Sequence, residues 1–250
     1  MTSWTPRLAN FFLADETPHA GLIVLAGLLS VAFVLVHVFQ LTNYFLPGGQ
    51  VKVVHIAGGI LLTFLALAVK DGTSRLQRWH FVAMAAITLI PLLYIFIEHE
   101  AITTERQFIV SDVDIGIGVL FLLLAMYAAW REWGWIMSAL ALGTLLYGYF
   151  GYLVPGELFF HAGIGLKRLL GYTSIPYFQG LLGGLSELSA GTIFPFMLFA
   201  AALEITGCVD YIMGVAYRIG GKTRAGPAQV AVVGSGMMGM VSGSSVANVA

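Results

Sequence analysis

Charged side chains are scarce in this sequence of 250 residues. Aspartate, glutamate, lysine and arginine together make up 10% of it, and 58% of the residues are hydrophobic, whereas a soluble domain usually carries about 25% charge. The mean hydropathy is +0.87. Too few polar groups are present to cover a globule in water. We therefore predict an all-α protein that crosses a lipid bilayer several times.

The sequence also lacks a strong net charge, a second cysteine and the features of a signal peptide. The net charge is −1, so nothing marks the chain as a nucleic-acid binder. Cys208 is the only cysteine, so no disulfide can form within the chain. The first apolar stretch follows Asp15, Glu16 and Pro18 rather than a short basic region, which argues against a cleaved signal peptide.

Long apolar runs divide the sequence, and a spanning helix needs about 20 mostly apolar residues. The first, fifth and sixth runs reach that length, the second to fourth are near the lower limit, and the seventh is too short to cross alone. We predict about six transmembrane helices and, from the seventh run, the start of a re-entrant hairpin. The runs are Ala20–Leu46, Val53–Val69, His80–Ile97, Val113–Trp130, Gly134–Val154, Gly191–Met213 and Pro227–Val241.

Two segments outside these runs also carry apolar residues. In residues 1–19, Trp4, Leu8, Phe11 and Phe12 share one helical face, which fits either a helix in the headgroup region or a partly ordered tail. In Pro155–Ala190, the apolar clusters suggest short helices on or partly in the membrane; they are Leu158–Phe160 and Leu181–Leu182.

The basic residues predict the orientation. If the apolar runs alternate in direction, eight of the twelve lysines and arginines fall on one side and four on the other. The richer side is cytoplasmic by the positive-inside rule. We therefore expect a cytoplasmic N-terminus, and we expect the acidic loop Glu98–Asp112 to face outwards.

The sequence contains partial matches to two enzymatic motifs, and neither match is complete. Gly221-Lys222-Thr223 would need a glycine at position 216 to form a phosphate loop, and that residue is Ala216. A serine hydrolase elbow reads G-x-S-x-G, which neither Ser235 nor Ser242 satisfies. We therefore predict that the chain is not an enzyme.

Three of the ionisable side chains within the apolar runs are candidates for a specific role. His37 and His55, in the first two runs, suit a hydrogen-bonded packing role, with a metal or proton role as the alternative, and Gly58-Gly59 would let a neighbouring helix approach closely. Glu204 follows the uncharged stretch Ile193–Leu203. It can reach a polar interior of the bundle or take part in transport.

The end of the sequence is rich in glycine and serine from Gly234 to Asn248. Glycine weakens a helix by about 0.8–1.0 kcal/mol per position relative to alanine. The pair Gly239 and Gly243 could serve tight helix packing, but packing does not explain the polar break Ser242–Ser245. Broken helices of this kind supply carbonyls and hydroxyls to cations and amide ends to anionic substrates.

Three segments carry a resemblance to a known family. Leu203-Glu204-Ile205-Thr206-Gly207, Ala225-Gly226-Pro227-Ala228 and Ser242-Gly243-Ser244-Ser245-Val246-Ala247-Asn248 resemble the large membrane subunit of TRAP (tripartite ATP-independent periplasmic) transporters. Residues 20–132 look like the small membrane subunit fused ahead of it, similar to permeases of the TAXI branch. Residues 133–250 look like the start of the large subunit, so the sequence looks like the front part of a longer permease.

The resemblance implies a function. It is that of an ion-coupled importer of small organic anions such as carboxylates, in the bacterial inner membrane, with a periplasmic substrate-binding protein and the remainder of the large permease region as partners. No cofactor is implied beyond the coupling ion, with sodium favoured over protons. The alternative is a membrane scaffold subunit without its own transport site. The implied ion and substrate site consists of Ser242, Gly243, Ser244, Ser245 and Asn248, with sodium at Ser242, Ser244 and Ser245.

Overall fold

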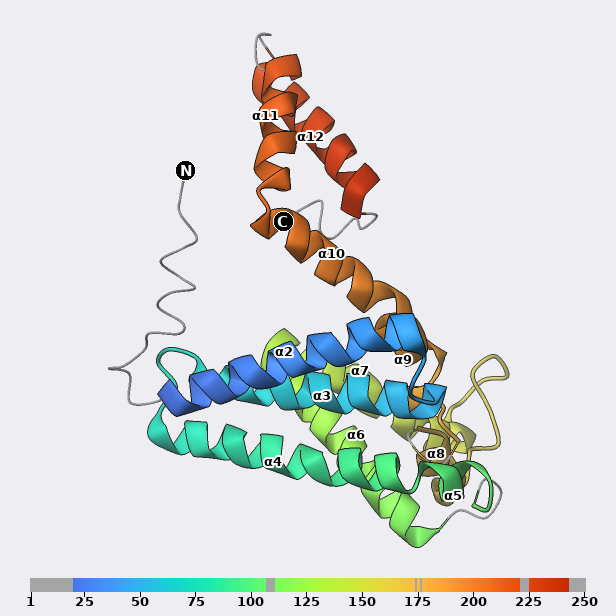
Figure 1. Cartoon of the computed structure of the whole chain (residues 1–250). Coiled ribbons are helices and arrows are strands. Elements are labelled where there is room, and N and C mark those ends of the chain that lie inside the picture. Colours follow the sequence, from blue (N-terminus) through green and yellow to red (C-terminus); the bar gives the residue numbers. More distant parts are fainter. Residues whose placement is uncertain (1–19, 107–110, 174, 176, 221–224, 243–250) are drawn as a thin grey trace. The chain divides into compact units, whose positions relative to one another are not determined.

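The computed structural model describes residues 20–106, 111–173, 175, 177–220 and 225–242, and the side chains of 240–242 are not described. All regular secondary structure in these ranges is helical (Figure 1), which confirms the all-α prediction. The chain divides into two compact units, Met1–Glu187 and Leu188–Ala250, and each is described by itself. The predicted interfacial or disordered segment 1–19 lies outside the described residues.

Helices long and apolar enough to cross a membrane number six in the described part of the chain. Five of them match the first five apolar runs: α2 (Ala20–Asn43), α3 (Gly48–Val69), α4 (Arg75–Ile97), α6 (Asp112–Trp133), and α7 (Trp135–Phe150) extended by the 3₁₀ turn η1 (Gly151–Leu153). The sixth candidate span covers Gly180–Ile205. The prediction of about six spans is therefore confirmed.

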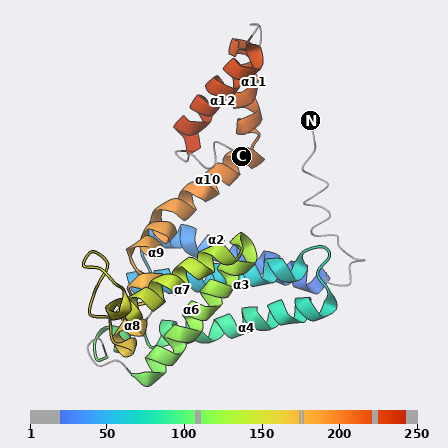
Figure 2. The ribbon, with the colours of Figure 1, turned by 180° about the vertical axis from the view of Figure 1, so that it is seen from behind.

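The core of the first unit surrounds α3. This helix packs against α2, α4 and α6, and α2, α3 and α4 run side by side in Figure 1. The view from behind shows α6 crossing this layer (Figure 2). Phe64 of α3 and Phe121 of α6 are completely buried, and the Phe64 ring lies 5.7 Å from that of Tyr127. Van der Waals packing of this kind is the main attraction between helices in a bilayer.

Local sequence sets where these helices begin and end. Ser74 and Gln77 form a reciprocal capping box at the start of α4. Gly134, with φ of 82°, is the single residue between α6 and α7, and its N–H donates to the Trp130 carbonyl. The Ser138 hydroxyl of α7 donates to the Met126 carbonyl of α6 at 2.7 Å, which ties the two helices together.

The two histidines join α2 to α3. His37 Nε2 lies 3.0 Å from His55 Nδ1, and His37 Nδ1 lies 2.8 Å from the Phe33 carbonyl oxygen. Since that carbonyl only accepts, His37 carries its proton on Nδ1 and accepts from His55 through Nε2. A Cβ at Gly58 would lie 2.7 Å from the Phe33 ring, whereas Gly59 faces open space. The predicted hydrogen-bonded packing is thus confirmed, with only Gly58 at the close approach.

One end of the first unit is built from short elements: α5 (His99–Thr103), α8 (Leu166–Thr173), the 3₁₀ turn η2 (Gly180–Leu182) and α9 (Gly184–Leu188). Leu181 and Leu182 lie in η2, as predicted for a short helix. The predicted helix at Leu158–Phe160 is wrong, because Glu157–Phe159 form a turn and these three apolar side chains are exposed.

The second unit comprises the π-helix η3 (Ser189–Ile193), α10 (Phe194–Ile205), α11 (Cys208–Gly220) and α12 (Gly226–Ser242). The prediction of one helix over Gly191–Met213 is wrong. Gly207 has φ of 75°, and its N–H bonds back to the Glu204 carbonyl. A glycine in this left-handed conformation ends a helix, so α10 stops at Ile205 although the apolar run continues.

Candidate transport site

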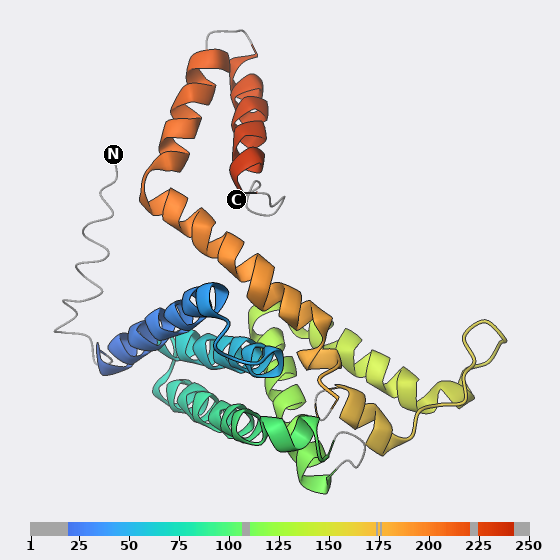
Figure 3. The same cartoon turned by 45° about the vertical axis from the view of Figure 1, so that its right-hand side comes forward.

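Helices α11 and α12 form a hairpin at the end of the described chain (Figure 3). Close contacts show that they run antiparallel. Gly220, at the end of α11, lies against Gln229 and Val230 near the start of α12, and Gly234 further along α12 faces Met213 and Ala216. Two glycines of this region, Gly220 and Gly234, therefore serve close packing between the helices. The packing role considered for Gly239 and Gly243 stays a prediction, since Gly243 lies outside the described residues. The connecting residues 221–224 lie outside the described ranges.

Neither helix of the hairpin is long enough to cross a bilayer. With 13 and 17 residues, they span roughly 20 and 25 Å at 1.5 Å per residue, whereas the hydrocarbon core is about 30 Å thick. The expectation that the seventh apolar run is too short to cross therefore holds for α12. Its last residue, Ser242, is the first residue of the predicted ion site.

The predicted site residues themselves are not brought together by the described coordinates. The Ser242 backbone belongs to α12, and its side chain is not described. Gly243, Ser244, Ser245 and Asn248 lie outside the described residues. Their roles stay predictions.

Glu204 is placed differently from the expectation that it lies well inside a span. It occupies the last turn of α10, is exposed, and has no ion-pair partner among the residues that the structure describes. The Gly207 N–H donates a hydrogen bond to the Glu204 carbonyl, and the Thr206 hydroxyl donates one to the Leu203 carbonyl. A carboxylate at a helix C-terminus meets the negative end of the helix dipole. Helix stability therefore does not explain a glutamate at this position.

Charged side chains form a network at the end of the first unit that carries α5. The fully buried Asp114 accepts a hydrogen bond from the Tyr94 hydroxyl at 2.8 Å. Arg106 Nη2 bonds to Glu98 Oε2 at 2.7 Å, and its Nε lies 3.8 Å from Asp114 Oδ2. That contact is an ion pair without a hydrogen bond. The network joins the end of α4 and the start of α6 to Arg106, which follows α5.

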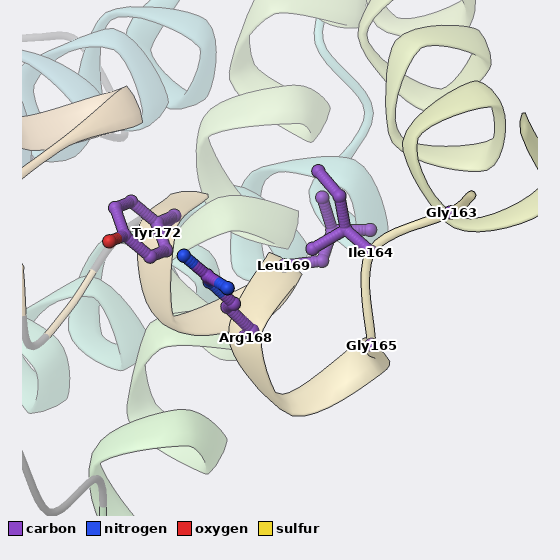
Figure 4. A pocket seen from close by; sticks show the side chains of 6 residues that line it. All are labelled: Gly163, Ile164, Gly165, Arg168, Leu169 and Tyr172. Carbon is purple, nitrogen blue, oxygen red and sulfur yellow. The ribbon is translucent and has the colours of Figure 1, made fainter. Parts of the chain in front are cut away.

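A cavity of about 530 Å³ lies along α8 (Figure 4). Its walls are the glycine-rich stretch Gly163–Gly165 and, from α8, Arg168, Leu169 and Tyr172. The Arg168 guanidinium lies 5.6 Å from the centre of the Tyr172 ring, a cation–π contact. Sequence reasoning missed this cavity. The available signal was the four-residue spacing of Arg168 and Tyr172, which places both on one helical face.

A second cavity, of about 340 Å³, lies where α3 begins. Three segments line it: the first residues of α3 with Lys52, helix α5 with His99 and Thr103, and the pair Tyr177 and Phe178. The His99 ring packs edge-on against Phe178. Burial lowers the pKa of His99 below its usual 6.5, so this imidazole is neutral at pH 7. The cavity therefore presents one full positive charge, that of Lys52.

Fold and site together define a class of protein. Six candidate spans followed by two helices too short to cross describe a multi-pass membrane protein whose described residues end in a helical hairpin. A family model described as "Tripartite ATP-independent periplasmic transporter, DctM component" matches residues 117–250, from within α6 onwards. The chain belongs to this family, which makes it a permease component of a TRAP transporter in the inner membrane.

The remaining comparisons add no relative. No curated protein and no solved structure matches the chain. The family is one of transporters and not of enzymes, in agreement with the failed enzymatic motifs.

Proposed function

We propose that this permease is part of a secondary active importer of small organic anions such as carboxylates, coupled to sodium and supplied by a periplasmic substrate-binding protein. The observation that carries the proposal is the match to the TRAP permease family over residues 117–250. Its second support is helix α12, which is too short to cross and leads directly into Ser242-Gly243-Ser244-Ser245. Hydroxyl and carbonyl oxygens at such a break are the ligands that small hard cations prefer.

In this proposal, Ser242, Ser244 and Ser245 contribute oxygen ligands to sodium, while Gly243 and Asn248 shape the substrate end. The test is uptake in proteoliposomes that contain the protein made from its full reading frame, with sodium varied at a fixed proton gradient. Ser245→Ala should raise the sodium concentration needed for half-maximal uptake by about tenfold, because one ligand to a charged ion is lost. Ser30→Ala is the matched control, since Ser30 bonds only within its own helix, to the Ala26 carbonyl.

Sodium dependence that is unchanged in Ser245→Ala would exclude the segment Ser242–Ser245, the serine-glycine tip, as the ion site. Uptake that is equally fast without sodium would identify protons, rather than sodium, as the coupling ion. A protein that binds its partner but supports no uptake would favour the alternative function, a membrane scaffold without its own transport site.

Glu204 is proposed to act in the ion pathway or at the moving part of the permease. Its exposure and its unfavourable place at the end of α10 support a role other than helix stability. Glu204→Gln should lower uptake several-fold at normal expression, whereas Glu157→Gln, in the outer turn of the first unit, should not. Wild-type uptake and ion dependence in Glu204→Gln would assign the residue to structure alone.

We also propose a cytoplasmic N-terminus. In the first unit, Lys70, Arg75, Arg78 and Arg131 belong to one end, and Lys52, Arg106 and Lys167 to the other, where the acidic side chains gather. Single cysteines at Gln107 and Thr223, in a Cys208→Ser background, test it in intact cells. An impermeant thiol reagent should label Gln107→Cys and spare Thr223→Cys, and the reverse pattern would invert the topology.

Residues 20–132 are proposed to be a fused small subunit of the TAXI type, although the family match already begins at residue 117, within α6. Helices α2, α3 and α4 precede residue 117 and pack on one another around α3. Two separate polypeptides, divided near residue 133, should then assemble when co-expressed. Failure to co-purify would argue against two fused subunits.

A further inference from the structure

The cavity at the start of α3 carries a positive charge that its surroundings compensate only weakly. The Lys52 side chain is 13% exposed, and buried lysines are normally paired. Its ammonium lies 3.7 Å from Glu187 Oε2, and the ammonium donates no hydrogen bond within the described part of the chain. Glu187 itself is 72% exposed. The pair is longer than a hydrogen bond and Glu187 is open to solvent, which weakens the attraction, so another carboxylate can replace Glu187.

The walls of this cavity suit a carboxylate of a small molecule. Its volume, about 340 Å³, lies at the lower end of the 300–1,000 Å³ found for small-molecule sites. The Tyr177 hydroxyl and the neutral His99 imidazole each offer one donor. The Thr103 hydroxyl does not, because it already donates to the His99 carbonyl at 2.8 Å. The first backbone N–H groups of α3, which have no partner within the helix, add a smaller contribution.

One glycine keeps the cavity open. A Cβ at Gly49 would meet the His99 ring, with its Cδ2 atom 2.8 Å away. A Cβ at the neighbouring Gly48 would meet nothing within 4 Å. The chain thus offers a matched pair of substitutions, one that displaces the imidazole and one that leaves it in place.

We propose that this cavity binds the carboxylate of a small organic anion at Lys52, and that Glu187 is the internal carboxylate that the anion replaces. A single lysine beside a neutral imidazole matches the single charge of one carboxylate group, whereas a free phosphate at pH 7 concentrates up to two charges on one group. The phosphate of a lipid headgroup has the same single charge and is the competing source. The inference goes beyond the proposed function, because it concerns the first unit and does not depend on the serine-glycine tip.

The test measures whether an anion bound in the cavity protects Lys52 from acylation. In the purified full chain, acylation of Lys52 by an amine reagent is followed by mass spectrometry with succinate, acetate or inorganic phosphate added at matched ionic strength. Succinate at ten times its Kd should slow the acylation of Lys52 about tenfold. Lys167, which pairs with Asp112 at 2.8 Å and is 61% exposed, should be acylated at an unchanged rate.

Four variants sharpen the result. Glu187→Gln should raise the affinity for succinate about two- to fivefold, a gain that misfolding cannot imitate. Gly49→Ala should abolish protection of Lys52, while Gly48→Ala keeps it. Ser245→Ala should keep it too, so that a failure of the transport proposal and a failure of this one remain distinguishable.

Equal acylation of Lys52 with and without succinate would overturn the proposal, and so would an affinity that Glu187→Gln leaves unchanged. Protection by phosphatidylglycerol nanodiscs, with none by succinate in delipidated protein, would assign the cavity to a lipid headgroup instead.

Discussion

The two units hold their helices in place by different means. In the first, large side chains such as Phe64 and Phe121 fill a core around α3, and polar contacts between helices fix their register. In the second, α10 buries no residue, and the buried apolar side chains among those described are Ala190, Ile212, Ala216 and Val230. There, α11 and α12 meet through glycine. The first unit is therefore specified by interlocking side chains and the second by close approach of backbones.

This difference has a meaning in a bilayer. Lipid tails are as apolar as leucine, so exposed apolar side chains cost nothing there and burial alone does not hold helices together. The first unit has the interlocking contacts of a fixed framework. The second has short helices with few such contacts. Four predictions test that contrast, from the largest effect to the smallest.

The largest effect is expected in the core of the first unit. Phe64→Ala should destabilise the protein by about 2 kcal/mol or more, because it leaves a cavity beside Tyr127 that neighbouring helices cannot fill. Phe196→Ala, on α10 and 55% exposed, should change stability by less than about 0.5 kcal/mol. Reversible denaturation of the protein in mixed micelles measures both. Equal losses would erase the distinction between the two units.

The charged network should contribute slightly less. Asp114→Asn leaves the partly buried Arg106 with Glu98 alone and should cost about 2 kcal/mol, below the 3–5 kcal/mol of a fully buried pair because Arg106 is partly exposed. Tyr94→Phe removes one hydrogen bond to the same carboxylate and should cost about 1 kcal/mol. The same denaturation assay applies. A neutral Asp114→Asn variant would show that the ion pair is dispensable.

The hairpin of the second unit should respond to a single methyl group. A Cβ at Gly220 would lie 3.0 Å from the Val230 backbone nitrogen. Gly220→Ala should therefore push α11 and α12 apart and cost about 1 kcal/mol or more. Gly236→Ala, with nothing within 4 Å, should instead stabilise α12 by up to about 1 kcal/mol. Hydrogen exchange of α12 amides distinguishes the two, and loosening in both variants would contradict packing through Gly220.

The smallest effect concerns pH. Burial lowers the pKa of His99 below its usual 6.5, so its imidazole becomes protonated only as the pH falls, and the proton adds a second positive charge near Lys52. Tyr177 lines the same cavity, and Glu187 is the carboxylate that pairs with Lys52. Succinate protection of Lys52 should strengthen a few-fold between pH 7 and pH 5.5, while folding stability declines, since the buried charged form is disfavoured. In His99→Gln, the strengthening should disappear.

Much of this architecture follows from the sequence. The first five spans are predictable because about 20 apolar residues in a row leave no alternative to a crossing helix. The contact between His37 and His55 is predictable in kind, since polar groups inside a bilayer seek each other. The break after Ile205 was missed because apolar residues continue on both sides of Thr206-Gly207, and only the positive φ of Gly207 reveals it.

The sites were less accessible to sequence reasoning. Asp114 looks like the second acidic residue of a helix start, and its burial depends on Tyr94 and Arg106 from other elements. The Lys52 cavity unites residues up to 131 positions apart, from Pro47 to Phe178, which no local pattern connects. The serine-glycine tip is the reverse case, since its composition suggests an ion site before any geometry is described.

The one-residue link at Gly134 bears on how the protein is made. Helices α6 and α7 cover Asp112–Phe150 with no loop between them, and a ribosome synthesises that stretch in roughly 2–8 s at 5–20 residues per second. The translocon therefore receives both helices almost together and has no hydrophilic segment on which to halt between them. They should enter the membrane as one hairpin, which commits Asp112 and Phe150 to the same face in a single event.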